Sequence, residues 1–261
     1  RGDKTSIYGT RVKKKKFNNR FNRSRFLSDS GIKRVFENAP PQQQFLLDLY
    51  WQENEKPEFN TQPLRVCLID IETYSPDSFP DVDNPNHVVN VITCYDNFTK
   101  KFHTFGIKPY NGKGRPDLNY VHCRDERDMF IKFLEYLESD YPDIISGWNS
   151  EFFDIPYIVG RIEHILGPDY VNRLSPLGRV YSRLIRGQFG REQKRFYIEG
   201  VACLDYLDVY KRFCLKLRES YKLDAIGELE LGQRKIDYGD SNLATLSDED
   251  WDKFIDYNIQ D

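Results

Sequence analysis

The sequence predicts an α/β protein with a mixed sheet covered by helices, and three observations support this fold class. The stretch Val66–Thr73 is apolar on both alternating faces, which is typical of a central strand in a covered sheet. Two further β-like segments follow it directly, and helical periodicity then alternates with short apolar strands. At 261 residues, 39% of them hydrophobic, the chain can form one large domain with an appendage.

The polar segment 52–63, which holds two prolines, predicts a boundary near residue 62, with an appendage at 1–62 and a main domain at 63–261. Strands are predicted at 64–72, 88–95, 101–105 and 143–146, and a protruding hairpin has its arms at 180–186 and 195–198. Helices are predicted at 36–51, 124–140, 153–166, 205–217, 223–229 and 247–261, the last with Ser247 as N-cap and Asp250 completing a capping box. Segments 75–86 and 108–119 are expected to be loops because they are rich in proline and polar or glycine residues.

Charge is divided unevenly along the chain. Residues 1–35 hold 12 lysines and arginines against two aspartates, a net charge of +10, whereas the whole chain carries −3 and the remainder therefore −13. Phenylalanines lie among these cations, as a binder of single-stranded nucleic acid would require, but a solvated leader has the same composition. The basic residues in question are Lys13, Lys14, Lys15, Lys16, Arg20, Arg23 and Arg25.

Several functional classes are poorly supported by the composition. The five cysteines are scattered, odd in number and without a Cys-x-x-Cys spacing, which argues against a zinc site or a disulfide framework and fits a reducing cytoplasm. The longest apolar runs are too short to span a bilayer, so no membrane association is expected. There is no Walker-type phosphate loop, Gly-x-Ser-x-Gly motif or dinucleotide-binding glycine motif.

Two acids stand at the end of the first predicted core strand. Asp70 and Glu72 are two residues apart, so they share one face of the strand, roughly 7 Å apart. Carboxylates on a rigid strand suit a hard divalent cation such as Mg²⁺ or Mn²⁺, which would neutralise two like charges partly removed from water. An acid at the solvent boundary of a strand is the ordinary alternative, and these two residues alone do not decide between them.

Two later positions add further acids. Asp154 follows a predicted strand and begins a helix, where N-capping before Pro156 is the ordinary alternative role. Tyr257 and Asp261 are four residues apart and share a helix face at the edge of an apolar stripe, where a core-edge aromatic and a solvated acid are the alternative. Together these acids could surround two divalent ions about 3.5–4 Å apart, the arrangement used for in-line displacement at phosphorus, with Tyr257 orienting the attacking water.

The three ordered motifs Asp70-Ile71-Glu72, Asn149-x-x-x-Phe153-Asp154 and Tyr257-x-x-x-Asp261 resemble those of the 3′→5′ proofreading exonuclease of family B DNA polymerases, which has a ribonuclease H-like fold. Further segments are similar to replicative polymerases of T-even-type bacteriophages: Phe79-Pro80-Asp81, Ile145–Asn149, Pro156–Ile158, Ser175–Arg179, Leu204–Asp208 and, in the leader, Ile7–Gly9. The resemblance covers 63–261 firmly and 1–62 loosely.

The resemblance implies that residues 63–261 are the exonuclease domain and that 1–62 are part of the polymerase N-terminal domain. It implies two Mg²⁺ or Mn²⁺ ions held by Asp70, Glu72, Asp154 and Asp261, and a water oriented by Tyr257. Asn149 and Phe153 would line the pocket for the terminal nucleotide, and Gln188 and Phe189 would tip a hairpin that parts the primer from its template.

The expected substrate is a single-stranded DNA 3′ end, hydrolysed to nucleoside monophosphates in the cytoplasm of an infected bacterial host. The expected partners are the remaining polymerase domains and replisome proteins, since palm, fingers and thumb motifs are not among these 261 residues. Two alternatives stay open. The chain could be a catalytically weak nucleic-acid-binding or assembly fragment of a split or truncated polymerase, or an exonuclease of similar fold that acts on RNA.

Overall fold

The computed structural model of the chain describes residues 4–5, 11–13, 15–31, 63–76, 78–112, 114–186, 192–214, 216–237 and 243–261. The chain divides into two compact units, Arg1–Gln62 and Pro63–Asp261. Four predicted features lie outside the described residues: the helix at 36–51, Lys14, the hairpin tip Gln188-Phe189 and the side chain of Arg20.

The first unit contains a two-stranded antiparallel ribbon and one helix. The strands are β1 (Lys4–Thr5) and β2 (Arg11–Val12), and the helix is α1 (Arg20–Asp29), which the sequence did not predict. Asn19 caps α1 by accepting a hydrogen bond from the Asn22 amide at 2.8 Å. Lys15 stacks its ammonium over the Phe26 ring at 3.4 Å, and Lys13 and Lys16 are exposed. Nucleic-acid binding by these cations stays a prediction.

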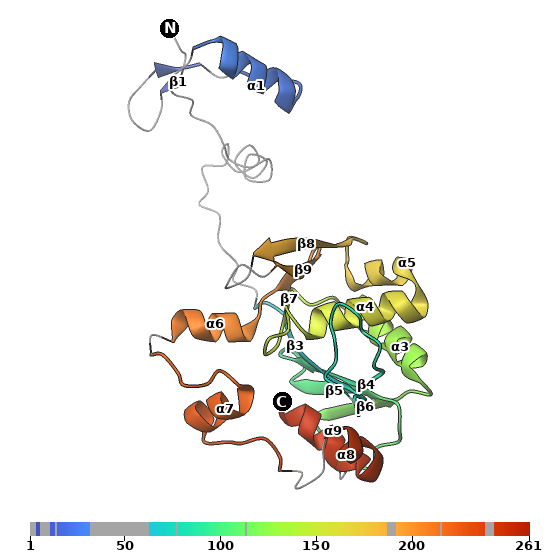
Figure 1. Cartoon of the computed structure of the whole chain (residues 1–261). Coiled ribbons are helices and arrows are strands. Elements are labelled where there is room, and N and C mark those ends of the chain that lie inside the picture. The colour runs from blue at the N-terminus through green and yellow to red at the C-terminus, as the bar shows by residue number, and fades with distance from the viewer. Residues whose placement is uncertain are drawn as a thin grey trace. The chain divides into compact units, whose positions relative to one another are not determined.

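The second unit is built around a six-stranded mixed sheet in the order β10-β7-β3-β4-β5-β6 (Figure 1). β3 is parallel to β7 and antiparallel to β4, β4 is antiparallel to β5, and β5 is parallel to β6. The strands are β3 (Val66–Thr73), β4 (Val89–Asp96), β5 (Lys101–Gly106), β6 (Leu118–His122), β7 (Ile144–Ser146) and β10 (Ala202–Cys203). A separate antiparallel hairpin joins β8 (Val180–Arg186) to β9 (Glu192–Ile198).

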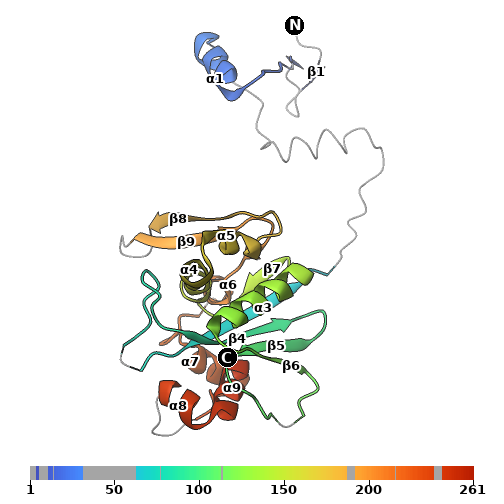
Figure 2. The same ribbon diagram turned by 90° about the vertical axis from the view of Figure 1, so that its right-hand side faces the viewer.

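Helices cover both faces of this sheet, as Figure 2 shows from the side. On one face α3 and α4 bury a large core with Ile69, Ile71 and Ile92 of the sheet. On the other face α8 and α9 bury a smaller core around Val91 and Trp251. The helices are α3 (Glu126–Ser139), α4 (Asp154–Leu166), α5 (Pro168–Val171), η1 (Asn172–Leu174), α6 (Tyr206–Phe213), α7 (Leu223–Leu231), α8 (Leu243–Glu249) and α9 (Trp251–Gln260).

The α/β fold class is confirmed, but several predicted elements differ. The single helix predicted at 247–261 is wrong, because α8 ends at Glu249 and Asp250 caps a second helix by accepting from the Lys253 amide at 3.0 Å. Ser247 lies inside α8 and is buried. The predicted loop 108–119 ends early, since β6 begins at Leu118. The second hairpin arm begins at 192 rather than 195, and the helix predicted at 205–217 is limited to 206–213.

One face of β3 is only partly covered. Ile69 and Ile71 are buried under α4, but Leu68, on the opposite face, is 43% exposed. On that face α9 covers the carboxyl end of the strand, where Asp70 and Glu72 lie.

Among the described residues, no helix has the length and apolar character needed to cross a bilayer.

Candidate active site

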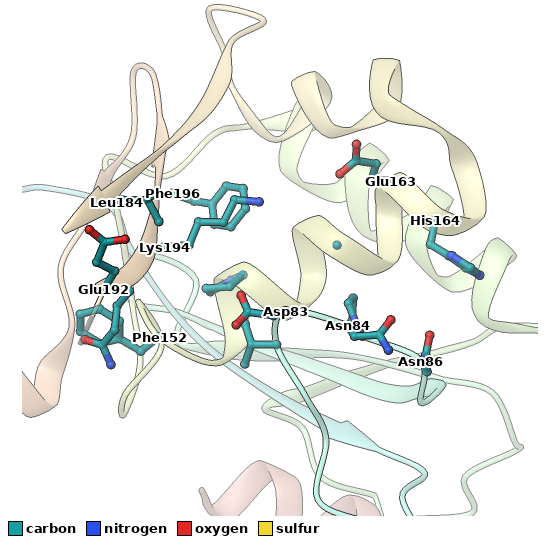
Figure 3. A pocket seen from close by; sticks show the side chains of 15 residues that line it. Asp83, Asn84, Asn86, Phe152, Glu163, His164, Leu184, Glu192, Lys194 and Phe196 are labelled. Atoms are coloured by element: carbon teal, nitrogen blue, oxygen red, sulfur yellow. The ribbon is translucent and has the colours of Figure 1, made fainter. Parts of the chain in front are cut away.

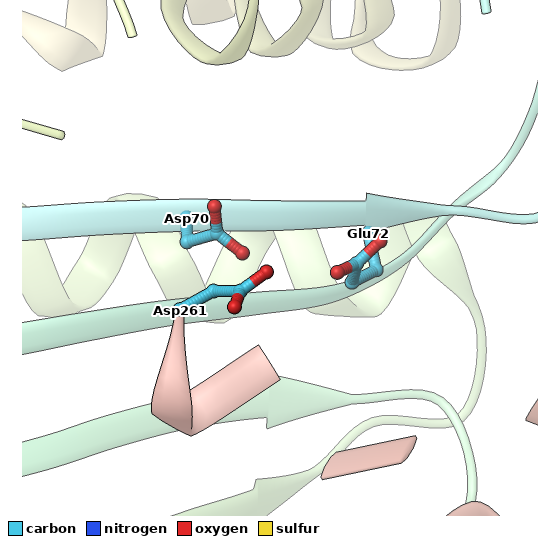
Figure 4. Close-up of side chains that lie close together, drawn as sticks. All are labelled: Asp70, Glu72 and Asp261. Atoms are coloured by element: carbon cyan, nitrogen blue, oxygen red, sulfur yellow. The ribbon is translucent and has the colours of Figure 1, made fainter. Parts of the chain in front are cut away.

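Three carboxylates meet where the end of β3 faces Asp261, the residue that follows α9. Asp70 and Glu72 lie along β3, and Asp261 approaches them from the end of the helix, as Figure 4 shows. One oxygen from each lies within 4.8 Å of the others. The donor set therefore fits a hard divalent cation, which prefers carboxylate oxygens.

Asp154 belongs to the same acidic group, although it is not one of the three converging carboxylates. Its Oδ1 accepts a hydrogen bond from the Ile71 amide at 3.2 Å, so the acid lies against the β3 backbone between Asp70 and Glu72. Helix α4 begins at Asp154 and its N-cap position is Phe153, which makes no side-chain cap. The N-capping role considered for Asp154 is therefore wrong, because its carboxylate is directed to the strand.

Burial raises the pKa of every acid in the group, and repulsion by the other acids raises those of Asp70 and Glu72 further. Burial, followed by the charge of Asp154, raises the pKa of Asp70 well above its usual range. Burial and the charge of Asp261 raise the pKa of Glu72 to about 8, and burial raises that of Asp154 to about 7. Such acids hold protons near neutral pH unless a cation compensates their charge. Electrostatics and geometry thus agree on a cation site.

A lysine already supplies part of that compensation. Lys235 Nζ donates to the Tyr257 hydroxyl at 3.0 Å and forms a short ion pair with Asp261. Burial lowers the pKa of Lys235, but the Asp261 carboxylate outweighs that effect and the net shift is upward. Burial raises the pKa of Tyr257 to about 12 although the Lys235 contact opposes it, so the phenol is neutral and can donate a hydrogen bond.

Asn258 of α9 binds Asp70, one of the three converging acids. Its Nδ2 donates to Asp70 Oδ2 at 2.6 Å, and its side chain is 1% exposed. Within the described part of the chain its Oδ1 has no hydrogen-bond partner. The contact fixes one carboxylate oxygen of Asp70. Tyr257 and Asn258 in the last turn of α9 and Asp261 directly after it thus reach the site together.

A tight turn between β7 and α4 delivers Asp154. Gly147 packs so closely on β3 that a Cβ there would lie 2.5 Å from the Ile69 carbonyl oxygen. Asn149 has a φ of 65°, in the left-handed region that asparagine tolerates better than most residues. Buried Asp205 accepts hydrogen bonds from the amides of Asn149 and Glu151 at 3.0 and 3.1 Å. The carboxylate of Asp205 therefore holds the turn in place.

The other predicted site residues are placed as follows. The side chain of Asn149 is exposed, and Phe153 stacks on Tyr157 with ring centroids 5.7 Å apart. Phe79 is 87% exposed, with its ring centroid 6.4 Å from that of Phe153. The structure brings Phe153 and Phe79 together as an open aromatic surface near Asp154. Their contact with a nucleotide stays a prediction.

Sequence analysis did not predict three residues that support the site: Lys235, Asn258 and Asp205. Asn258 lies inside the third motif, so its position on the same helical turn as Tyr257 and Asp261 was available from spacing. Asp205 stood within a segment already noted for its resemblance. No pattern in the sequence around Lys235 predicts its place in the site, because the path of the chain after α7 brings it to the acids.

The fold and the acid group together define a class. A six-stranded mixed sheet with helices on both faces and partly buried carboxylates at the end of a central strand is consistent with the ribonuclease H-like nuclease fold. Residues 18–226 match the family model of the DNA polymerase family B exonuclease domain, and the chain belongs to this family. The match ends before Lys235, Tyr257 and Asp261, so their inclusion in the site rests on geometry.

Viral DNA polymerases are similar to this chain over most of its length. The DNA-directed DNA polymerase of Escherichia phage RB69 is 31% identical over 241 residues, covering 83% of this chain and 26% of the relative. That of Enterobacteria phage T4 is 32% identical over 222 residues, covering 76% and 24%. The DNA polymerase of Paramecium bursaria Chlorella virus NY2A is 27% identical over 194 residues, covering 67% and 21%. The chain thus spans about a quarter of the length of these relatives.

Proposed function

We propose that the chain is a 3′→5′ exonuclease that removes nucleoside monophosphates from single-stranded DNA 3′ ends with two Mg²⁺ or Mn²⁺ ions. The observation that carries the proposal is the convergence of Asp70, Glu72 and Asp261 within 4.8 Å, with Asp154 bound to the amide between the first two. Residues 63–261 would form the exonuclease domain, and residues 1–62 part of the polymerase N-terminal domain.

The four acids would hold the two ions, which when bound supply a water of lowered pKa and neutralise charge on the leaving oxygen. The residues of the chain have separate tasks. The neutral Tyr257 hydroxyl, held by Lys235 at 3.0 Å, orients the attacking water. The Lys235 ammonium adds positive charge beside the reacting phosphate, where fixed donors stabilise developing negative charge. Asn258 keeps Asp70 in one orientation.

The substrate-contacting residues are proposed from exposure and position. Phe153 and Phe79 offer aromatic faces next to Asp154, and bases stack on such faces with little sequence preference. Exposed Asn149 would line the pocket for the terminal nucleotide. The remaining polymerase domains and replisome proteins are the proposed partners, and the cytoplasm of an infected bacterial host is the proposed location, which the phage relatives support.

The test is cleavage of a 5′-labelled single-stranded DNA oligonucleotide with Mg²⁺, with Mn²⁺ and with EDTA. Metal-dependent release of single nucleotides from the 3′ end is expected, with a loss of roughly 10³-fold or more in D70A, because the acid positions the reacting groups. The control is D169N, which removes one exposed carboxylate on α5. Equal rates in D70A and D169N would exclude the acid group as the catalytic site.

Two further arms separate the alternatives. A matched RNA oligonucleotide should be degraded much more slowly if the pocket rejects a 2′-hydroxyl, and equal degradation would favour an RNA exonuclease. Oligonucleotide binding without cleavage in any metal would favour the binding or assembly fragment. In that case, a calorimetric titration with Mn²⁺ would show whether the acids bind the metal.

A further inference from the structure

The segment between β3 and β4 carries the exposed side chain of Phe79. It leaves the end of β3 and returns at the start of β4, and its two ends are tied together. The tie is a hydrogen bond from the Tyr74 amide to the Val88 carbonyl at 2.8 Å. A loop closed at its base in this way is a compact surface loop. Its described residues, 74–76 and 78–88, are called here the Phe79 loop.

His87 connects the two halves of the Phe79 loop. Its Nδ1 lies 3.2 Å from the Tyr74 carbonyl oxygen, and its Nε2 lies 3.0 Å from the Ser78 hydroxyl oxygen. Because a carbonyl oxygen can only accept, Nδ1 carries the proton of that bond. In the neutral ring Nε2 then accepts from the Ser78 hydroxyl. One imidazole thus joins the residue that follows β3 to the residue that precedes Phe79.

Helix α4 holds the part of the loop that carries His87. The Tyr157 hydroxyl donates to the His87 carbonyl at 2.9 Å, and Arg161 Nη1 donates to the Pro85 carbonyl at 3.0 Å. Gly160 lies so close to the loop that a Cβ on it would approach Pro85 Cγ to 2.6 Å. These three helix positions share one face of α4. The helix therefore provides a fixed base for His87.

A buried ion pair fixes Arg161 in turn. Its side chain is 6% exposed and binds Glu126 of α3 through Nε at 2.8 Å and through a second, shorter bond from Nη2. Glu126 Oε1 also accepts from the Val89 amide at 2.8 Å. A buried pair stays in one arrangement because separating it would leave an uncompensated charge. The return of the Phe79 loop to β4 is therefore anchored to two helices.

A cavity of about 680 Å³ borders the Phe79 loop on the side of the hairpin formed by β8 and β9. Figure 3 shows this cavity with Asp83, Asn84 and Asn86 of the loop and with Leu184 and Phe196 of the hairpin. Since the cavity separates the two segments there, the hairpin does not press the loop into place. Among the described residues, the contacts with α4 and the His87 bridge hold it.

A purely structural role for His87 must be weighed, because polar side chains in loops commonly satisfy nearby backbone groups. That role explains the bond to the Tyr74 carbonyl. The second bond instead restrains exposed Ser78, and with it Phe79, which is 87% exposed and whose ring centroid lies 6.4 Å from that of Phe153. Holding an exposed ring in one place costs conformational entropy that burial of the ring does not recover. The second bond therefore serves a ligand of the ring better than it serves the fold.

We propose that His87 is a positioning residue that holds Phe79 beside Phe153, so that the terminal base of the substrate stacks on a preformed pair of rings. The inference rests on the proposed function, because it takes the substrate to be a nucleic-acid 3′ end. A ring that is already in place lowers the ordering cost of binding. Loss of the His87 bridge therefore weakens capture of the 3′ end and leaves the reaction at the acids unchanged.

The first test is steady-state cleavage of a single-stranded DNA oligonucleotide by the full chain in saturating Mg²⁺. F79A should raise KM about 5- to 150-fold, the range for one base–aromatic stack. H87L and S78A should each raise KM about 2- to 12-fold, the range for one side chain that must be ordered on binding, with kcat unchanged. The matched control is H122L, which removes an exposed histidine from β6.

The double variant F79A/H87L separates positioning from a role in folding. If His87 acts through Phe79, the double variant has the KM of F79A, because the ring that His87 positions is already absent. A KM that multiplies the two single effects would overturn the proposal, and so would an H87L value equal to that of H122L. Should H87L not fold, S78A and F79A/S78A, which remove only an exposed hydroxyl from the loop, are read by the same criteria.

A binding measurement in EDTA keeps this result separate from catalysis. The probe is a single strand with 2-aminopurine at its 3′ end, whose fluorescence falls when the base stacks. The unmodified chain should quench the probe at saturating protein, and F79A, H87L and S78A should quench it less. Quenching that depends on His87 without any cleavage in Mg²⁺ would leave the positioning role standing and remove the proposed exonuclease activity. Cleavage with a KM and quenching that do not depend on His87 would remove the positioning role alone.

Discussion

Lys235 shows how a single residue changes the chemistry of the acid group. Its ammonium contacts both the Tyr257 hydroxyl and Asp261, and its side chain is about one-third exposed. The backbone on both sides is fixed, because the Lys235 amide donates to Asp224 at 2.9 Å and Gln260 donates to the Arg234 carbonyl at 2.9 Å. The lysine is therefore a preorganised cation beside the proposed reacting phosphate rather than a solvated surface charge.

We predict that K235M lowers the rate of oligonucleotide hydrolysis by roughly 10²-fold at saturating metal, because one fixed donor to the reaction centre is removed. K235R should retain more activity than K235M. The measurement is single-turnover cleavage of a single-stranded DNA oligonucleotide. K101Q, which removes an exposed lysine from β5, is the control. A K235M rate equal to that of K101Q would show that the lysine has only a structural role.

At the scale of elements, the turn between β7 and α4 positions the second acidic motif. Asp205 joins three backbone amides, since it also accepts from the Leu207 amide at 2.9 Å and so caps α6. One buried carboxylate therefore links the turn before Asp154 to the start of the next helix. Helix α6 is consequently part of the support of the site, although none of its residues touches the acids.

We predict that D205A lowers the unfolding free energy by about 1–3 kcal/mol and reduces hydrolysis at least tenfold, because buried amide donors lose their acceptor and the turn relaxes. Hydrogen exchange at the amides of Asn149 and Glu151 should become faster. D208N removes an exposed carboxylate from the same helix and should do neither. Unchanged exchange at both amides in D205A would contradict the role given to Asp205.

The sequence predicted elements well where the signal was local. β3, α3 and α4 have strong apolar periodicity, and their bounds came close to the observed ones. β6 was not predicted, because its strand state depends on pairing with β5, which its own residues do not reveal. The acids were predicted from motif spacing, whereas Lys235 was not, because no pattern in the sequence brings a residue after α7 to the end of α9. The local elements and the acids could thus be predicted, whereas the position of Lys235 depends on the path of the whole chain and could not.

At the scale of the whole molecule, the buried acids link stability to pH in the metal-free protein. In an unfolded chain Glu72 and Asp154 ionise near their ordinary pKa values of 4.5 and 3.8, whereas in the folded protein their pKa values are about 8 and about 7. Between these limits the folded state holds more protons than the unfolded state. Stability must therefore fall as pH rises through this window. His103 acts in the opposite direction, because burial lowers its pKa, but it is a single group.

We predict that the melting temperature of the metal-free protein falls by roughly 12–25 °C between pH 5 and pH 8. Glu72 and Asp154 together lose about 4.5 pKa units of stabilisation in this range, at about 1.4 kcal/mol per unit and about 2–4 °C per kcal/mol. Mg²⁺ or Mn²⁺ should restore stability most strongly at pH 8. A cation binds the ionised carboxylates, and these acids lose their protons most easily at high pH. The measurement is thermal unfolding followed by circular dichroism in EDTA and in each metal. E72Q/D154N cannot ionise at these two positions, so its melting temperature should vary less with pH and respond less to metal. A wild-type melting temperature that stays level or rises from pH 5 to pH 8 would contradict the burial of uncompensated carboxylates, and with it the electrostatic basis of the site.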